Sequence, residues 1–196
     1  MPPSGLIPSD FSYSIRLAQA TDVAFLADIE RAAAQQFMPY LEWLEIPTHL
    51  LEGLTTPGFL LRAQADERLW VAVIADQAVA ADKVIGFLVA KYLADSFFIV
   101  ELDVHPDYGR RGVGSALVRA CCHSAYRRGL DRVLLTTFRK VPWNIPFYQR
   151  LGFEVWPKSR WSAEIKAIVQ HEARYGFSPD KRAVMGCSVA SFGPAI

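Results

Sequence analysis

Three glycines and two arginines lie within residues 109–114, the stretch best suited to binding a charged ligand. An apolar, strand-like run precedes this stretch and a helical pattern follows it. The N-terminus of a helix presents unpaired backbone N–H groups and the positive end of the macrodipole, and both favour anions. Glycine lets the backbone approach a ligand without a Cβ in the way, and arginine adds charge-assisted contacts. The stretch therefore predicts a pyrophosphate site, and the alternative is an ordinary glycine turn into a helix with solvated arginines.

The glycine spacing argues against two common phosphate-binding motifs. It reads G-x-x-G-x-G, not the dinucleotide pattern G-x-G-x-x-G, and no Lys-Ser/Thr pair ends it as in a nucleotide-triphosphate loop. The preceding strand is expected to be antiparallel to its neighbour, whereas the Rossmann motif follows the first strand of a parallel unit. A nucleotide-phosphate protein would need a motif that this sequence lacks.

Two carboxylates, Glu101 and Asp103, lie in the strand-like run before the glycines. Simple alternation along the strand predicts two faces. One face is expected to carry Phe98, Val100, Leu102 and Val104, and the other Ile99, Glu101, Asp103 and His105. Two carboxylates on one face are costly to bury unless they are used or paired. Either could serve as a base, pair with an arginine or face solvent.

The composition suits one compact domain: 196 residues, 52% hydrophobic, with 21 Lys and Arg against 20 Asp and Glu. The net charge of +1 predicts neither a nucleic-acid nor a membrane partner. No apolar run is long enough for a transmembrane helix, and the N-terminus does not resemble a signal peptide. Three cysteines without framework spacing predict a reduced, cytoplasmic chain, and the histidines predict no metal site.

The elements expected to position these residues form an α/β (α+β) fold with a mixed, mainly antiparallel sheet of six to seven strands, flanked by helices on both faces. Strands are expected at 13–18, 68–76, 83–94, 97–105, 131–138, 153–156 and 182–189. Helices are expected at 20–37, 113–128, 145–152 and 162–176, and Pro39 is expected to end the first of them. One or two further short helices are expected within 40–54, where Pro47 would break them. The segment 97–138 predicts a parallel crossover. Residues 1–12 are expected to be a tail, 13–157 the domain core, and 158–196 a helix and strand completing it.

Two motifs resemble landmarks of a known family. The stretch "LDVHPDYGRRGVGSALV" resembles the signature motif of the GNAT superfamily of acyl-CoA N-acyltransferases, and "PFYQRLGF" (146–153) resembles its second landmark. The resemblance covers roughly residues 13–157 and implies the GNAT fold. It also implies an acetyl-CoA site whose pyrophosphate is held by N–H groups of residues 109–114. The motif differs at Gly109, where the superfamily usually has Gln or Arg; Arg110 and Arg111 are expected to supply that contact.

The resemblance further implies that strand 97–105 diverges from strand 131–138. Its free N–H and C=O groups would then hold the pantetheine arm, and an N–H near Val104 would polarise the thioester carbonyl. Asn144 is expected either to contact the arm or to cap the following short helix. The expected CoA-binding residues are Leu102, Val104, Gly109, Arg110, Arg111, Gly112, Val113, Gly114, Ser115, Asn144 and Phe147, the last mainly as a core residue.

The function expected from the resemblance is transfer of an acetyl group from acetyl-CoA to a primary amine, by direct attack in a ternary complex. An amine is mostly ammonium at neutral pH, so a base should remove a proton. Glu101 is the first choice and Asp103 the second. Tyr148 matches the tyrosine to which the superfamily assigns proton donation to the departing thiolate, although it could be a core aromatic.

The acceptor side is less defined by the sequence. Phe37, Tyr40, Trp43 and Trp143 are expected to line it, or to pack in the core, and no strong acidic patch is evident. A monomer or a homodimer is expected. The alternative is a non-catalytic acyl-CoA-binding or regulatory module on the same fold, because fold alone cannot separate the two. Tyr148 together with an acid on the strand favours the enzyme.

Overall fold

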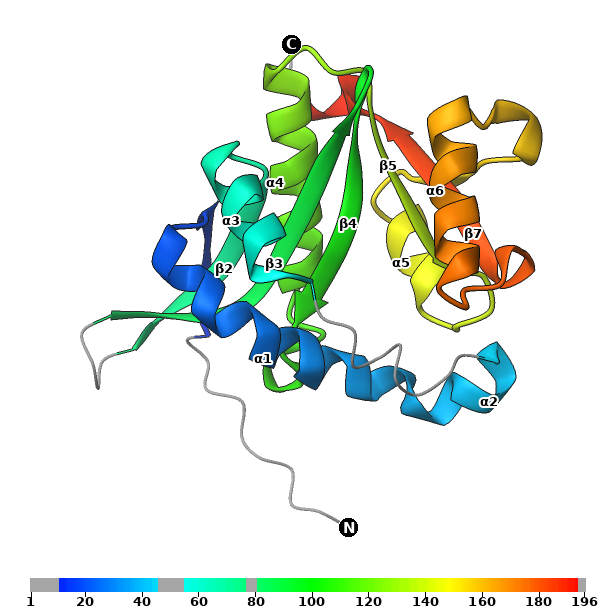
Figure 1. Cartoon of the computed structure of the whole chain (residues 1–196). Coiled ribbons are helices and arrows are strands. Elements are labelled where there is room, and N and C mark those ends of the chain that lie inside the picture. The colour runs from blue at the N-terminus through cyan, green and yellow to red at the C-terminus, as the bar shows by residue number, and fades with distance from the viewer. Residues whose placement is uncertain (1–10, 46–54, 77–80, 194–196) are drawn as a thin grey trace.

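The computed structural model describes residues 11–45, 55–76 and 81–193, and these form one seven-stranded sheet covered by helices (Figure 1). The strand order is β1-β2-β3-β4-β5-β7-β6, and β4 and β5 are the one parallel pair among the pairings of these strands. The strands are β1 (Ser14–Leu17), β2 (Leu69–Asp76), β3 (Ala81–Leu93), β4 (Ser96–Val104), β5 (Arg132–Phe138), β6 (Glu154–Val155) and β7 (Arg182–Ser188). The predicted fold class is confirmed.

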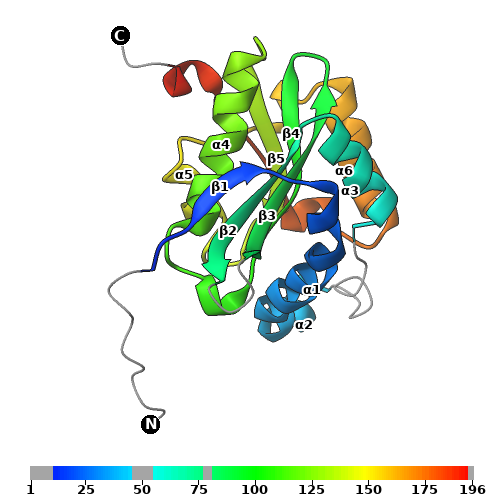
Figure 2. The same cartoon turned by 90° about the vertical axis from the view of Figure 1, so that its left-hand side faces the viewer.

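Helices cover both faces of the sheet (Figure 2). One face carries α4 (Val113–Arg127) and α5 (Asn144–Gln149), and the other carries α1 (Val23–Ala34), α3 (Pro57–Ala65) and α6 (Ala163–Arg174). The apolar stripe of α4, including Leu117, Val118 and Cys121, is fully buried against the strands. Removing such side chains from water is the main force that holds the layers together.

Strand β4 contains a β-bulge that simple alternation did not predict. Val89 of β3 lies opposite Glu101 and Ala90 lies opposite Ile99, so Val100 is the extra residue. Ile99 therefore packs on the α4 side with Leu102 and Val104, while Phe98 packs on the α6 side. The predicted faces were wrong for the residues before the bulge. Beyond the bulge, Glu101 and Asp103 share a face as expected.

The segment after α1 also differs from the prediction. Pro39 does not end the helical path, because it lies inside a 3₁₀ turn (Gln35–Tyr40) that leads into α2 (Leu41–Leu44). Pro47 lies outside the described residues. Helix α3 was not predicted, although Thr56 at its N-cap and Pro57 at its first position are typical start signals.

The C-terminal segment contributes an interior strand. After α6, β7 pairs antiparallel with both β5 and β6, so it lies between them in the same sheet. Ser162 caps α6 by accepting a hydrogen bond from the Ile165 N–H at 3.2 Å. In the described residues, no helix is long and apolar enough to span a bilayer.

Candidate functional site

A gap between β4 and β5 lies at the centre of the sheet. The two strands pair from Ser96 with Arg132 to Ile99 with Leu135 and no further, so they separate where the Val100 bulge bends β4 (Figure 1). The N–H of His105 donates to Ile85 O in β3 at 2.9 Å. Because successive N–H groups of a strand point to opposite edges, the N–H groups of Val104 and Leu102 face the gap. The divergence expected from the resemblance is present.

The N-terminus of α4 lies at the open end of this gap. The first helical hydrogen bond runs from the Ala116 N–H to Gly112 O, so the N–H groups of Val113, Gly114 and Ser115 have no partner within the helix. Gly112 adopts φ +83°, a left-handed conformation that favours glycine. The N–H of Gly109 donates to Pro106 O at 3.0 Å. The amides of residues 110–115 are therefore the ones left to form the predicted anion cradle, whereas the Gly109 amide, which was also expected there, already donates to Pro106.

The two arginines of the motif are arranged differently. Both side chains are exposed, and Arg110 itself has a left-handed φ of +58°. The Arg111 guanidinium lies over the ring of Phe11 at 4.6 Å from its centroid, in a cation–π contact. Phe11 in turn stacks on Tyr108. Arg111 is thus held beside the cradle, whereas Arg110 extends from a strained backbone into solvent.

Of the two α5 residues predicted to contact CoA, Phe147 lies next to the start of α4. A Cβ on Gly114 would lie 3.5 Å from Phe147 and 3.7 Å from Val104, so these residues enclose the start of α4. Asn144 is buried in the first turn of α5, and its side chain makes no capping hydrogen bond. Trp143 occupies the N-cap position. The capping role considered for Asn144 is therefore wrong.

Three carboxylates converge on the side of the gap that faces α1. One carboxylate oxygen each from Glu30, Glu101 and Asp103 lie within 4.8 Å of one another. Glu30 was not predicted to belong to the site. Its position on the apolar face of the predicted helix was a signal that this charged side chain is buried. Its oxygens accept hydrogen bonds from the N–H and Oγ1 of Thr55, each 3.0 Å long.

Burial and mutual repulsion raise the pKa values of Glu101 and Asp103. Burial and the charge of Glu30 raise the pKa of Glu101 to about 7. Burial, with the charges of Glu101 and Glu30, raises the pKa of Asp103 well above its ordinary value. Asp103 is 8% exposed, and its Oδ2 is buried without a hydrogen-bond partner among the described residues. A base with a pKa near 7 suits proton transfer at neutral pH.

Tyr148 packs on the opposite side of the gap. Its ring lies 4.9 Å from that of Phe147 and 5.7 Å from that of Phe153. Burial, together with the charges of Glu101 and Asp103, raises the pKa of its hydroxyl above the ordinary value. The phenol therefore stays protonated at neutral pH and can donate a hydrogen bond.

The four aromatic residues predicted for the acceptor side form one cluster. Tyr40 lies 5.2 Å from Trp143 and 6.4 Å from Trp43, and Phe37 lies 5.8 Å from Trp143 (distances between ring centroids). Phe138 at the end of β5 packs against Phe37. Trp43 is 45% exposed, so the cluster reaches from the core to the surface.

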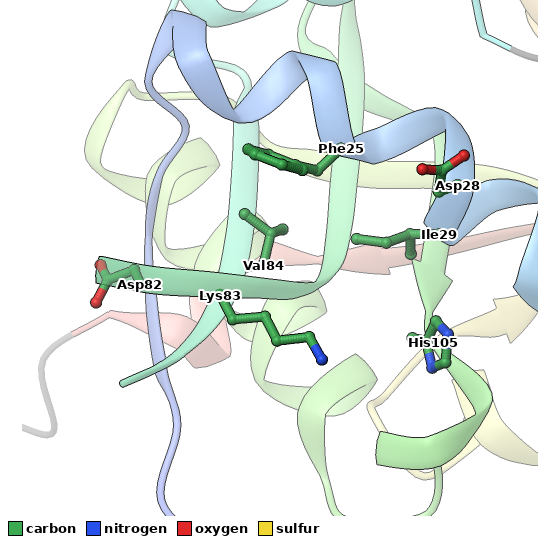
Figure 3. A pocket seen from close by; sticks show the side chains of 7 residues that line it. All are labelled: Phe25, Asp28, Ile29, Asp82, Lys83, Val84 and His105. Carbon is green, nitrogen blue, oxygen red and sulfur yellow. The ribbon is translucent and has the colours of Figure 1, made fainter. Parts of the chain in front are cut away.

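A pocket of about 300 Å³ lies elsewhere, between α1 and the start of β3 (Figure 3). Its lining consists of Phe25, Asp28, Ile29, Asp82, Lys83, Val84 and His105. Lys83 extends from β3 toward His105 in this view (Figure 3). None of the predicted site residues lines this pocket, so it does not coincide with the gap.

The comparisons with known proteins agree with this geometry. The model of the acetyltransferase (GNAT) family matches residues 31–153. The fold is similar to that of PaiA N-acetyltransferase from Thermoplasma acidophilum, crystallised with coenzyme A, at 17% identity and a TM-score of 0.66 over 91% of this chain and 99% of that chain. It is also similar to the ribosomal-protein-S18-alanine N-acetyltransferase of Escherichia coli, at 17% identity and a TM-score of 0.59 over 94% and 99% of the two chains.

A third solved structure is the N-acetylglutamate synthase of Neisseria gonorrhoeae, complexed with coenzyme A and N-acetyl-glutamate. It is 16% identical, with a TM-score of 0.63 over 92% of this chain and 36% of that chain. Identities this low show the fold alone, but the family model covers more than half of the sequence. Together with the strand gap and the cradle at its open end, that match shows that the chain belongs to the GNAT family of acetyltransferases.

Proposed function

We propose that this protein transfers an acetyl group from acetyl-CoA to a primary amine by direct attack in a ternary complex. The observation that carries the proposal is the gap between β4 and β5, with free amides at its open end, carboxylates on one side and Tyr148 on the other. The amides of residues 110–115 would hold the diphosphate of CoA. Free main-chain groups of β4 would hold the pantetheine arm as an added strand would.

Each step is assigned to a group of this chain. Glu101, directly or through a water, accepts a proton from the substrate ammonium and frees the amine for attack. The Val104 N–H donates to the carbonyl oxygen on which negative charge develops. As the C–S bond breaks, Tyr148 donates a hydrogen bond to the departing thiolate. The thiolate takes up the second proton of the attacking amine, so that the amide and free CoA thiol are the products. The raised pKa of Tyr148 favours hydrogen bonding over complete proton loss from the phenol.

The test is thiol release from acetyl-CoA across a panel of primary amines, with the acetylated product identified by mass. The proposal predicts thiol release that depends on an amine and matches the amount of product. CoA binding without amine-dependent thiol release for any member of the panel would contradict it and favour a non-catalytic acyl-CoA-binding module.

A further inference from the structure

The cluster of Glu30, Glu101 and Asp103 joins two elements that the sequence does not obviously connect. Glu30 comes from α1, whereas Glu101 and Asp103 come from β4 beyond the bulge. Glu30 and Asp103 are each 8% exposed. Carboxylates this close, and this far from water, either keep a proton or need a cation to join them.

Among the described residues, the charge of Arg182 acts on Glu101 and lowers its pKa, but it does not outweigh burial and the neighbouring carboxylates. None of the three carboxylates takes part in an ion pair among the described residues. The nearby Arg182 is already engaged, because its Nε donates to Glu172 at 3.1 Å and its Nη2 donates to Thr136 at 2.8 Å. Its guanidinium also lies over the ring of Phe138 at 4.7 Å. The buried, unpartnered Oδ2 of Asp103 is a second sign that the cluster accepts a group from outside.

We infer that these three carboxylates form a cation subsite that restricts the acceptor to amines carrying no anionic group close to the reacting nitrogen. This inference rests on the proposed function and narrows its substrate class. An ammonium has three N–H donors, which suits a ring of carboxylate oxygens. A carboxylate attached next to the amine would be brought close to the cluster and repelled by those of its members that are ionised.

The stem of the acceptor is expected at the aromatic cluster of Phe37, Tyr40, Trp43 and Trp143. The 3₁₀ turn after α1 carries Phe37 and Tyr40 on the same chain segment as Glu30, and Arg182 contacts Phe138 of that cluster. An apolar or aromatic stem attached to the ammonium would pack there. The class of acceptor is therefore an alkyl or arylalkyl ammonium.

The experiment compares three acceptors that share one aromatic stem. Tyramine has no carboxylate, tyrosine has one beside the amine, and tyrosine methyl ester keeps the bulk without the charge. We expect kcat/KM for tyramine to exceed that for tyrosine by on the order of 100-fold, from Coulomb repulsion at partly buried distances. The ester should regain most of the loss. After correction for the lower amine pKa of the ester, equal rates for tyrosine and its ester would overturn the inference.

Substitution of Glu30 tests whether the preference for tyramine over tyrosine comes from the carboxylate cluster. Glu30→Gln should lower the tyramine-to-tyrosine ratio of kcat/KM by roughly ten-fold, since one repelling charge is lost. Asp28→Asn is the matched control, because Asp28 lies on the same helix with its side chain 81% exposed and should leave the ratio unchanged. An unchanged ratio in Glu30→Gln, with the variant folded by circular dichroism, would contradict the assignment of Glu30.

The outcomes separate this inference from the proposed function. Thiol release with tyramine and tyrosine at equal rates would leave the acetyltransferase standing and remove the cation subsite. Tyramine binding to the CoA complex, measured by calorimetry and weakened by Glu30→Gln, but without thiol release, would keep the subsite and remove the transfer. Binding of Ca²⁺ that Glu30→Gln abolishes, together with equal acceptor rates, would assign the carboxylates to a metal ion instead.

Discussion

At the scale of single residues, the site depends on two groups whose pKa values are both raised but to different effect. Burial and neighbouring carboxylates bring the pKa of Glu101 to about 7, where it can both accept and release a proton. The same surroundings raise the pKa of Tyr148 and keep it protonated. One environment thus suits the proposed base and the proposed hydrogen-bond donor, which lie on opposite sides of the gap.

The pKa of Glu101 predicts the pH dependence of turnover. The carboxylate is the active form, so kcat/KM should fall about ten-fold per pH unit below 7 and level off above it, for an amine that binds as ammonium. Glu101→Gln should lower kcat by roughly 10²–10⁴-fold and remove this acidic limb. Initial rates from pH 5 to 9 measure both. An acidic limb of full slope in Glu101→Gln would assign the base elsewhere.

Tyr148→Phe tests the donor to the departing thiolate. A hydrogen bond to a charged group contributes about 1.5–3 kcal/mol, so kcat should fall roughly 10–100-fold while the affinity for acetyl-CoA stays nearly constant. Tyr175→Phe is the control, because Tyr175 is 58% exposed at the end of α6. A rate equal to that of the parent protein would exclude Tyr148 from the rate-limiting step.

At the scale of elements, one helix terminus and one bulge form the candidate site. Gly112 begins α4 in a left-handed conformation, and Gly129 follows the same helix at φ +71°. Gly112→Glu should abolish measurable CoA binding, because it adds bulk and negative charge to the cradle. Gly129→Glu carries the same backbone strain and charge at the far end of the helix, so it should lose stability but still bind CoA. Calorimetric titration of both variants with CoA measures the difference. Comparable CoA affinities of the two variants would contradict binding of CoA by the amides of residues 110–115.

The Val100 bulge makes a second prediction at this scale. Deleting Val100 keeps Ile99 and Glu101 on opposite faces but removes the bend at which β4 leaves β5. We expect the shortened strand to pair further along β5, close the gap and weaken CoA binding at least ten-fold. A folded deletion variant, verified by circular dichroism, that binds CoA as the parent does would show that the bulge is not needed for the gap.

At the scale of the whole molecule, local patterns predicted most of the fold. Strand-forming runs, the glycine stop after α4 and the Ser162 cap of α6 are local signals, so the seven strands and the main helices lie close to their predicted positions. The bulge was missed because a single extra residue in β4 is visible only against its partner strand. Pro39 was misjudged because a 3₁₀ turn accommodates a proline that a continuing α-helix would not.

The candidate site also has one part that local sequence predicts and one part that it does not. The cradle could be read from contiguous residues, since a glycine-rich turn into a helix is a local feature. The acidic cluster could not, because Glu30 and Glu101 are far apart in sequence and meet only when α1 packs across β4. Whether Arg111 reaches a phosphate or an aromatic ring also depends on Phe11, which comes from the start of the described chain.

The most direct test of the central claim is a crystal structure of the protein with CoA. We predict that the diphosphate oxygens lie within hydrogen-bonding distance of the amides of residues 110–115, and that the sulfur lies in the gap between β4 and β5 beside Tyr148. A structure in which CoA lies outside that gap, or in which the gap is closed by pairing of the two strands, would contradict the account.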